Sequence, residues 1–351
     1  MRHLIDFGDL AREEWDELYQ RADKIITAPE QYIDACRGKV AASLFYEPST
    51  RTNFSFQTAM LRLGGTVFGF ADPKSSSAAK GESLKDTIKM VSGYADVIVM
   101  RTPWEGAAKA ASLYSDVPVI NAGDGGHMHP TQTTADLTTI TRLRGSVDGM
   151  TIGLCGDLKN GRTVHSLIKA LAKFKDIRFY LIAPRELAIP DYLRQFMKAN
   201  NMPFTEVTGL ESVIPQLDVL YMTRIQRERF VDPLEYERNK GIYVLTRKKL
   251  ERAKPDMMVL HPLPRVDEIA NDVDDDPRAA YFKQARFGMF ARMALLMDLA
   301  NQPRIQPEPV AIGTKPVCHN PNCITQTEHY LPPLVKKNGG VDCCAFCDAA
   351  L

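Results

Sequence analysis

The sequence predicts an α/β protein with two domains, each a parallel sheet with flanking helices, and a small zinc-binding module at the C-terminus. Short apolar runs alternate with stretches of helical spacing in two successive series, which indicates two sets of βα units. A proline-rich stretch and a crowd of cysteines follow. We place the domains at residues 1–144 and 145–280, the linker at 303–317 and the zinc-binding module at 318–351. The closing helix, 281–302, is expected to pack back on the first domain.

Composition limits the classes of function. The chain has 351 residues, of which 44% are hydrophobic, and this is enough for two packed cores. Lys and Arg number 44 against 43 Asp and Glu, so the net charge of +1 predicts neither nucleic acid nor a membrane as a partner. No apolar stretch has the length of a membrane span, and Met1–Leu10 does not resemble a targeting segment. We therefore expect a cytoplasmic protein.

The first domain is predicted to begin with an amphipathic helix and to contain four short strands. The helix covers residues 10–26, and the strands cover 40–46, 66–70, 96–100 and 117–121. Further helical spacing begins at residue 52, covers residues 84–91 and occurs again in the stretch that ends at residue 143. A polar loop after the second strand, 72–81, is expected to be mobile. The loop after the fourth strand, 122–132, is rich in glycine and histidine.

The second domain repeats the alternation. Its predicted strands are 150–155, 177–182, 204–207, 218–222 and 257–260, with a helix up to 171 and a long closing helix at 281–299. Strands that are joined through helices run parallel, so this half also predicts a parallel sheet.

The segment Ser49-Thr50-Arg51-Thr52 lies between the first strand and the helix after it. Hydroxyl donors and a guanidinium are thus placed at a helix N-terminus, where backbone N–H groups and the positive end of the helix dipole attract anions. The tetrapeptide by itself also fits an ordinary Ser/Thr cap beside a solvated arginine. The other segments favour an anion-binding turn.

Basic residues follow several other predicted strands. In open α/β sheets ligands bind outside the carboxyl ends of the strands, so we expect these residues to converge on one crevice between the domains. They are Arg51, Arg101, His129, Arg162, Arg224 and His261.

These residue types bind anions but supply no strong nucleophile. The sequence has no Gly-x-Ser-x-Gly elbow, no Walker loop and no His-Glu-x-x-His, and Gly153–Asp157 matches a dinucleotide turn poorly. An enzyme of this kind can still transfer a group that carries a good leaving group, such as phosphate, by holding the acceptor beside it. Catalysis is therefore expected to rest on positioning and to need no cofactor.

Three motifs carry a resemblance to a known family. Ser49-Thr50-Arg51-Thr52, His129-Pro130-Thr131-Gln132 and His261-Pro262-Leu263-Pro264-Arg265 resemble, in order and spacing, the motifs of the transcarbamoylases, over residues 1–303. Met222–Gln226 and Leu158–Ser166 resemble the aspartate carbamoyltransferases within that family. The resemblance implies the transfer of a carbamoyl group from carbamoyl phosphate to L-aspartate, the committed step toward pyrimidines. A transcarbamoylase with another acceptor, such as ornithine, is the alternative.

The resemblance also implies a role for each residue. Ser49, Thr50, Arg51, Thr52 and Arg101 would hold the phosphate, and His129 with Thr52 and Arg101 would polarise the carbamoyl oxygen. Gln132 and the segment at Leu263 and Pro264 would orient the carbamoyl NH₂ group. The carboxylates of aspartate would bind Arg162, Arg224 and Gln226. Ser76 and Lys80 would come from the loop 72–81, which in this family reaches into a neighbouring subunit of a homotrimer.

Some positions stay open. Ala79 stands where the family often has a second basic residue, and Ser75, Ser76 and Ser77 compete for the phosphate contact. His261 fits a structural histidine as well as a direct ligand. His127 and His165 are interpreted as structural.

The tail carries four cysteines in two knuckles, Cys318-x₄-Cys323 and Cys344-x₂-Cys347. In a reducing compartment such spacing predicts a structural zinc site, because four thiolates suit tetrahedral zinc and so short a segment needs the metal to fold. Cys343 would need a three-residue gap to Cys347, so it is expected to be a neighbour and not a ligand.

The segment Cys318–Ile324 resembles the zinc domain of the regulatory chain that accompanies some aspartate carbamoyltransferases. A regulatory chain is thus a possible partner, and the tail resembles a fused docking module. Two different classes remain beside the enzyme: a nucleic-acid-binding zinc protein, for which the tail offers only Lys336 and Lys337 as a basic pair, and a non-catalytic scaffold on the same fold.

Overall fold

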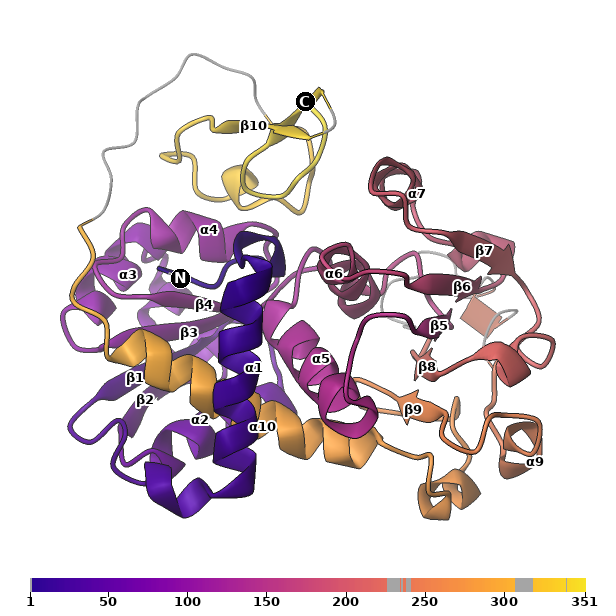
Figure 1. Ribbon diagram of the computed structural model, residues 1–351. Helices are drawn as coiled ribbons and strands as arrows, with labels where there is room; N and C mark the ends of the chain where they lie inside the picture. Colours follow the sequence, from indigo (N-terminus) through magenta and orange to yellow (C-terminus); the bar gives the residue numbers. More distant parts are fainter. Residues whose placement is uncertain (1, 226–233, 235, 238–240, 307–317, 339) are drawn as a thin grey trace. The chain divides into compact units, whose positions relative to one another are not determined.

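The computed structural model describes residues 2–225, 234, 236–237, 241–306, 318–338 and 340–351 (Figure 1). The chain divides into two compact units. The first unit comprises Met1–Thr134 with Gly288–Leu351, and the second comprises Ala135–Phe287. Both are α/β, as the sequence predicts.

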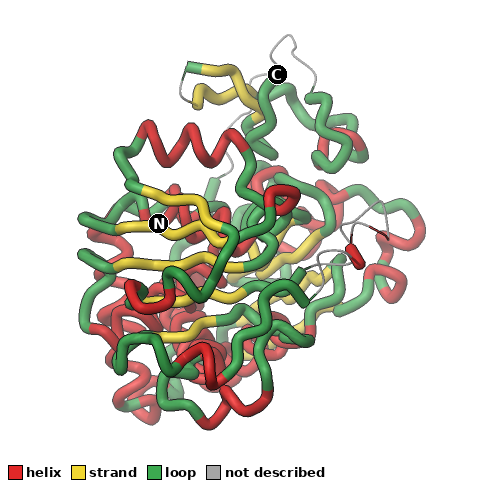
Figure 2. Tube along the Cα trace, turned by 90° about the vertical axis from the view of Figure 1, so that its right-hand side faces the viewer, coloured by secondary structure: helices red, strands yellow, loops and turns green. Residues whose placement is uncertain are grey.

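The first unit contains a four-stranded parallel sheet, whose strands lie side by side in Figure 2. The strand order is β2-β1-β3-β4, so the two central strands are flanked on both sides. The strands are β1 (Val40–Phe45), β2 (Thr66–Phe70), β3 (Val97–Thr102) and β4 (Val119–Asp124). Because all four are parallel, their carboxyl ends meet at one edge of the sheet.

Helices and the tail complete the first unit. Arg292 of α10 lies over the Phe56 ring of α2 and donates to Ser55 at 3.0 Å, and Asp298 of α10 pairs with Arg21 of α1. The C-terminal part of α10 therefore packs within the first unit. The helices are α1 (Arg12–Thr27), α2 (Thr50–Arg62), α3 (Leu84–Ser92), α4 (Ala107–Ser112), α5 (Pro130–Arg144) and α10 (Tyr281–Ala300), of which α5 and α10 continue into the second unit.

Four local features of this unit differ from the sequence prediction. Arg101 lies inside β3 and not after it, because β3 continues through a register shift to pair Thr102 with Asp124. For the same reason 122–124 belong to β4 and not to the loop. The alanine-rich α4 is an additional helix, and the loop 72–81 contains two short 3-10 turns, Pro73–Ser75 and Ser77–Lys80.

The second unit contains a five-stranded parallel sheet of order β7-β6-β5-β8-β9. Its strands are β5 (Thr151–Cys155), β6 (Arg178–Ile182), β7 (Phe204–Val207), β8 (Val219–Met222) and β9 (Met258–Leu260). The helices α6 (Arg162–Leu171), α7 (Asp191–Ala199) and α9 (Arg247–Leu250) belong to the same unit. The carboxyl ends of the neighbouring strands β5, β8 and β9 again share one edge.

The tail folds around an antiparallel hairpin of β10 (Val335–Asn338) and β11 (Val341–Cys344). Its buried side chains join the apolar cluster formed by α3, α4 and one face of the first sheet. Ile324 and Phe346 contribute to this cluster, and Figure 1 shows the tail in yellow next to α4. The tail thus packs on the first unit of its own chain. Among the described residues, no helix combines the length and apolar character that crossing a membrane requires.

Candidate active site and metal centre

The anion turn lies at the carboxyl edge of the first sheet. Ser49 is the N-cap of α2, and in the described part of the chain its side chain forms no capping hydrogen bond. Thr50 and Arg51 are exposed at this turn, whereas Thr52 is buried. Asn53 in the same turn accepts a hydrogen bond from Ser43 of β1 at 2.9 Å. The start of α2 is therefore held against the sheet and faces a position where an anion can bind.

Arg101 approaches the same edge from β3. Phe45, the last residue of β1, is its register partner, so Arg101 is level with the end of the strand that leads into the anion turn. The guanidinium is buried and lies 3.2 Å from the Glu47 carboxylate, with a longer contact of 3.5 Å to the Ala122 carbonyl oxygen. Glu47 therefore orients this arginine. The sequence offered no signal for this role of Glu47 except that Glu47 follows a strand.

Asp124 organises the loop that leads to His129. One carboxylate oxygen accepts hydrogen bonds from the Met128 N–H at 3.0 Å and from Asn121 at 3.1 Å. The other accepts from the Gly106 N–H at 2.8 Å. His129 is buried directly before α5, and its carbonyl oxygen accepts from the N–H of Gln132 at 3.0 Å. An aspartate between glycines indicates a loop, but it does not reveal which distant groups the carboxylate will bind.

His127, in the same loop, is held between two carboxylates. Its Nδ1 lies 3.1 Å from Asp124, and its Nε2 lies 3.4 Å from Asp348 of the tail. Burial by itself would lower the pKa of His127, but the Asp124 and Asp348 carboxylates outweigh it and raise this pKa to about 10. His127 is therefore a cation that connects the loop to the tail, in agreement with its structural interpretation.

Ser76 lies between the two 3-10 turns that follow β2, and Lys80 ends the second turn, at the same edge of the sheet. The Ser76 hydroxyl donates to the Pro73 carbonyl oxygen at 2.8 Å and caps the second turn. Lys80 is exposed. The first unit thus brings one group of predicted site residues to a single edge: Ser49, Thr50, Arg51, Thr52, Ser76, Lys80, Arg101, His129 and Gln132.

Arg162 and Arg224 occupy the corresponding edge of the second sheet. Arg162 is the first residue of α6, after the turn that follows β5, and Arg224 follows β8. The two loops are joined, because the Asp157 N–H donates to the Thr223 hydroxyl at 3.1 Å. Gly156 keeps them close: it has φ +120°, and a β-carbon there would lie 2.3 Å from the Thr223 carbonyl oxygen. Gln226 lies outside the described residues.

The loop after β9 carries Leu263 and Pro264 and is shaped by His261. One ring nitrogen accepts from the Leu263 N–H at 2.8 Å, and the other lies 2.6 Å from the Glu268 carboxylate. Burial would raise the pKa of Glu268, but the bond with His261 holds it below its usual value. Leu263 has φ +55° and precedes a cis peptide bond to Pro264. His261 is buried and bonded on both sides, so its geometry fits the structural interpretation.

His165 also shapes a loop. Its Nε2 lies 2.8 Å from the Leu158 carbonyl oxygen, and the Tyr192 hydroxyl lies 3.0 Å from its Nδ1. These contacts hold the segment between β5 and Arg162, which fits the structural interpretation of this histidine.

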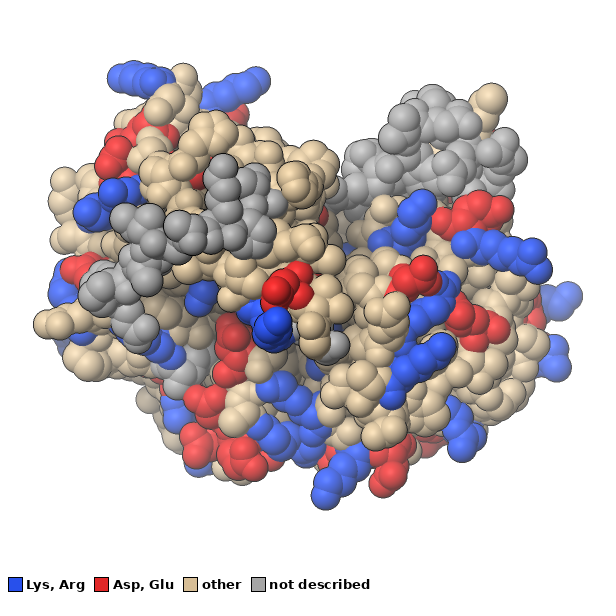
Figure 3. All heavy atoms as spheres, turned by 90° about the horizontal axis from the view of Figure 1, so that it is seen from above, with Lys and Arg blue, Asp and Glu red and all other residues tan. Residues whose placement is uncertain are grey.

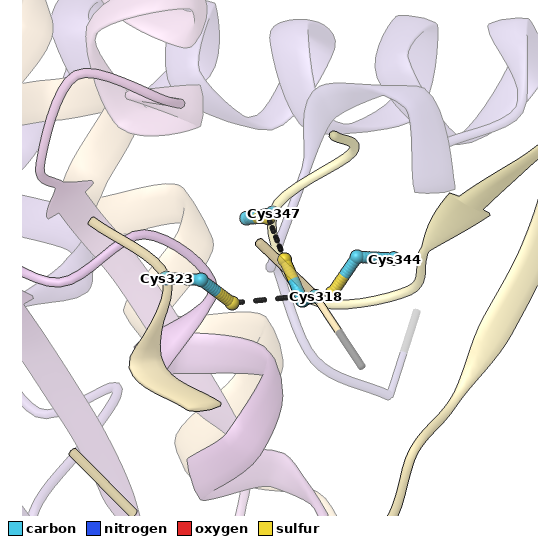
Figure 4. Close-up of side chains that lie close together, drawn as sticks. All are labelled: Cys318, Cys323, Cys344 and Cys347. Atoms are coloured by element: carbon cyan, nitrogen blue, oxygen red, sulfur yellow. Dashed lines mark hydrogen bonds between the residues drawn. The ribbon is translucent and has the colours of Figure 1, made fainter. Parts of the chain in front are cut away.

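Four cysteine side chains of the tail converge on one point (Figure 4). Their sulfur atoms lie within 4.8 Å of one another, and all four residues are buried. The Cys318 and Cys347 sulfurs are 3.6 Å apart, and those of Cys323 and Cys344 are 3.9 Å apart. Zinc with tetrahedral thiolate ligands at about 2.3 Å requires separations of about 3.8 Å. The cluster therefore has the donor set and dimensions of a structural zinc site.

Cys343 does not belong to this cluster. Its sulfur lies 3.7 Å from the Val341 carbonyl oxygen, on the hairpin. The four cysteines that meet are those the sequence spacing selected.

The chain matches the models of two domains of one known protein family. A model of the aspartate/ornithine carbamoyltransferase carbamoyl-P binding domain matches residues 2–142, and a model of the Asp/Orn binding domain of the same family matches residues 148–299. The chain belongs to the aspartate/ornithine carbamoyltransferase family. The tail lies beyond the residues that the two models match.

Relatives within the carbamoyltransferase family are close. The aspartate carbamoyltransferase catalytic subunit of Clostridium perfringens is 60% identical over 302 residues, which are 86% of this chain and 98% of the relative. The catalytic subunit of Clostridium novyi is 62% identical over 295 residues, 84% of this chain and 96% of the relative. These identities concern the carbamoyltransferase body.

Solved carbamoyltransferases share the fold. The catalytic subunit of M. jannaschii aspartate transcarbamoylase has a TM-score of 0.80 and 51% identity, and the match covers 85% of this chain and 98% of that one. Aspartate transcarbamoylase from Trypanosoma cruzi, in complex with carbamoyl phosphate and aspartate, has a TM-score of 0.80 and 39% identity over 85% and 96% of the two chains.

Proposed function

We propose that the chain transfers the carbamoyl group of carbamoyl phosphate to the amino group of L-aspartate, giving N-carbamoyl-L-aspartate and phosphate in pyrimidine biosynthesis. The observation that carries this proposal is the convergence of Arg51, Arg101 and His129 at one edge of the first sheet, on or after three different strands. Close relatives named aspartate carbamoyltransferase support aspartate as the acceptor.

The chemistry requires little more than positioning. The aspartate nitrogen attacks the carbamoyl carbon, the bond to the phosphate oxygen breaks, and the nitrogen loses a proton. Negative charge grows on the leaving phosphate, and the arginines with the N-terminus of α2 stabilise it. His129 is assigned to the carbamoyl oxygen, with Thr52 and Arg101. No cofactor takes part in these steps.

The acceptor is assigned to the second unit. Guanidinium groups bind carboxylates through two parallel hydrogen bonds, so Arg162 and Arg224 suit a dicarboxylic amino acid. Gln226 is assigned to the same task from the family motif. Leu263 and Pro264 are assigned to the carbamoyl NH₂ group together with Gln132. In this assignment residues 1–144 bind carbamoyl phosphate and residues 145–280 bind aspartate.

The experiment is an assay of the purified chain with carbamoyl phosphate and either aspartate or ornithine. We expect N-carbamoyl-L-aspartate to form and ornithine to be inert, and Arg51→Ala to reduce kcat by about 100-fold or more while the far-UV spectrum stays unchanged. Activity with ornithine alone would assign the chain to the ornithine branch. A folded chain that carbamoylates neither acceptor would favour the non-catalytic scaffold.

A homotrimer with shared active sites is part of the proposal. Lys80 is exposed in a loop at the carboxyl edge, a position from which it can serve a neighbouring subunit. Mixing inactive Lys80→Ala and Arg51→Ala trimers under exchange conditions is expected to restore part of the activity. Verified mixed trimers without activity would mean that each site is built within one chain.

The second part of the proposal is one structural zinc ion per chain, held by Cys318, Cys323, Cys344 and Cys347. The burial of all four residues and the separations of their sulfurs support it. The zinc would serve the folding of the tail and take no part in carbamoyl transfer. A separate regulatory chain as a partner and a cytoplasmic location of this protein stay predictions from the sequence.

A nucleic-acid-binding role finds less support. On the face that Figure 3 shows, Lys and Arg side chains are interspersed with Asp and Glu. The basic pair of the tail already forms ion pairs within the tail. Lys336 lies 2.5 Å from the Asp348 carboxylate, and Lys337 lies 2.8 Å from the Asp342 carboxylate. Binding to nucleic acid needs a basic surface that is not neutralised in this way.

A further inference from the structure

We propose that the tail positions the substrate loop 73–83, because Glu328 and Tyr330 cap the first turn of α3, the helix in which this loop ends. The inference rests on the proposed function, which assigns Ser76 and Lys80 of this loop to carbamoyl phosphate. It adds two positioning residues that lie outside the region matched by the family's two domain models.

The caps of α3 come from two distant parts of the chain. The first N–H groups of any α-helix lack partners within the helix and need others. Leu84 donates its N–H to the Glu328 carboxylate at 2.9 Å, and Lys85 donates its N–H to the Tyr330 hydroxyl at 2.8 Å. Ser83, the local N-cap, receives only the third N–H, that of Asp86, through its side chain at 3.1 Å. Two of the first three N–H groups are therefore satisfied by the tail.

The chemistry of these contacts suits a cap. A carboxylate at a helix N-terminus interacts favourably with the positive end of the helix dipole, and hydrogen bonds to a charged acceptor are stronger than neutral ones. Tyr330 also packs edge to face on Tyr114, with ring centroids 5.8 Å apart. The Lys85 ammonium lies 5.3 Å from the Tyr114 ring and 5.7 Å from the Tyr330 ring. The side chain of Lys85 thus covers the same contact.

The cap bears directly on the loop. Only three residues separate Lys80 from Leu84, and the Glu82 N–H donates to the Ser77 carbonyl oxygen at 3.3 Å. The Thr87 hydroxyl of α3 donates to the Glu82 carboxylate at 2.8 Å. The loop therefore has two anchors, the end of β2 and the start of α3. Loss of the caps would fray the first turn of α3 and release the second anchor.

The tail connects this anchor to the proposed metal centre. The Glu328 N–H donates to the Ile324 carbonyl oxygen at 2.9 Å, and Ile324 follows the ligand Cys323. A change in the cysteine cluster would thus move the segment that carries Glu328 and Tyr330. Metal binding and the order of the substrate loop are coupled through one turn of the tail.

The experiment compares the double variant Glu328→Ala/Tyr330→Phe with His329→Ala in the full chain. His329 is exposed and lies between the two capping residues, so its variant controls for a change in the same turn. The first readout is amide hydrogen exchange of the segment 73–86, which does not depend on activity. We expect exchange at least about tenfold faster in the double variant only, with an unchanged zinc content in both.

The second readout is kinetic. The double variant is expected to raise the KM for carbamoyl phosphate several-fold more than the KM for aspartate, because the loop is assigned to phosphate. Glu328→Gln keeps an acceptor oxygen, so in this variant the amide exchange should stay close to the slow rate of the wild type. Faster exchange confined to 84–86, with 73–83 and both KM values as in the wild type, would overturn the inference. Absence of carbamoyl transfer in the wild type would count against the proposed function, and the exchange data would still decide the inference.

Discussion

Gly106, in the turn before α4, touches the backbone of Phe346 in the tail. A β-carbon at residue 106 would lie 2.6 Å from the Phe346 carbonyl carbon, and the glycine has φ +80°. The tail is thus fitted to the first unit at a point where only hydrogen can stand between two backbones.

Gly106→Ala is therefore expected to loosen the tail. Gly38→Ala is the matched control, because Gly38 has φ +77° in the same unit, but a β-carbon at residue 38 would meet open space, with nothing within 4 Å beyond its chain neighbours. In both variants backbone strain should lower the free energy of unfolding by about 1 kcal/mol. Only Gly106→Ala should also make the tail sensitive to limited proteolysis. Equal resistance of the two variants would contradict a close contact.

His127 predicts a pH dependence of stability. Its folded pKa of about 10 lies above the ordinary value of 6.5, so its stabilisation is complete below pH 6.5 and is lost as the pH rises toward 10. Over this range the free energy of unfolding of the wild type should fall relative to that of His127→Gln, by at most about 1.4 kcal/mol per pH unit. Urea unfolding of both proteins measures the difference. Parallel curves would show that the two carboxylates do not hold a proton on His127.

Arg224→Lys tests the choice of acceptor. An ammonium keeps the charge but cannot form two parallel hydrogen bonds with a carboxylate, so the KM for aspartate should rise by about tenfold or more. The KM for carbamoyl phosphate should change little. Arg185→Lys, in the same unit but outside the assigned aspartate ligands, serves as the control. Steady-state kinetics decide the point, and equal effects on both substrates would make Arg224 structural.

The cysteine cluster predicts which thiols bind zinc. Cys344→Ser removes one of four converging sulfurs, so zinc content should fall from about one ion per chain toward none. Cys343→Ser, one residue away, should keep its zinc because its sulfur faces the Val341 carbonyl oxygen. Metal analysis of the purified variants gives the answer. A reversed pattern would mean that the ligands are misassigned.

Removal of the zinc by a chelator is expected to loosen the tail and, through the substrate loop, to raise the KM for carbamoyl phosphate, while carbamoyl transfer continues in the body at saturating substrate. The family models end at residue 299, before the first cysteine of the cluster. Activity and proteolysis measured on the same sample separate the two effects. Activity that disappears with the metal from an otherwise stable protein would give the zinc a role in catalysis.

Features that depend on local spacing could be predicted from the amino-acid sequence. Alternation of apolar runs and helical patterns predicted the two parallel sheets, because each element must bury one face. Residues such as Arg162 and His129 are predicted as site residues because they follow strands, and the carboxyl ends of parallel strands share an edge. The four clustered cysteines were selected because a two-residue gap closes one knuckle at Cys344 and Cys347.

Contacts between groups that are distant in the sequence became apparent only in the folded chain. Arg101 lies within β3 because that strand is extended by pairing with β4, and strand ends depend on neighbours rather than on local sequence. The partners Asn121 and Met128 are near Asp124 in the chain, but no local pattern shows that its carboxylate also binds the Gly106 N–H, which belongs to the separate turn before α4. Backbone N–H groups donate to any suitable acceptor, so no local pattern in α3 could reveal that Glu328 of the tail caps it.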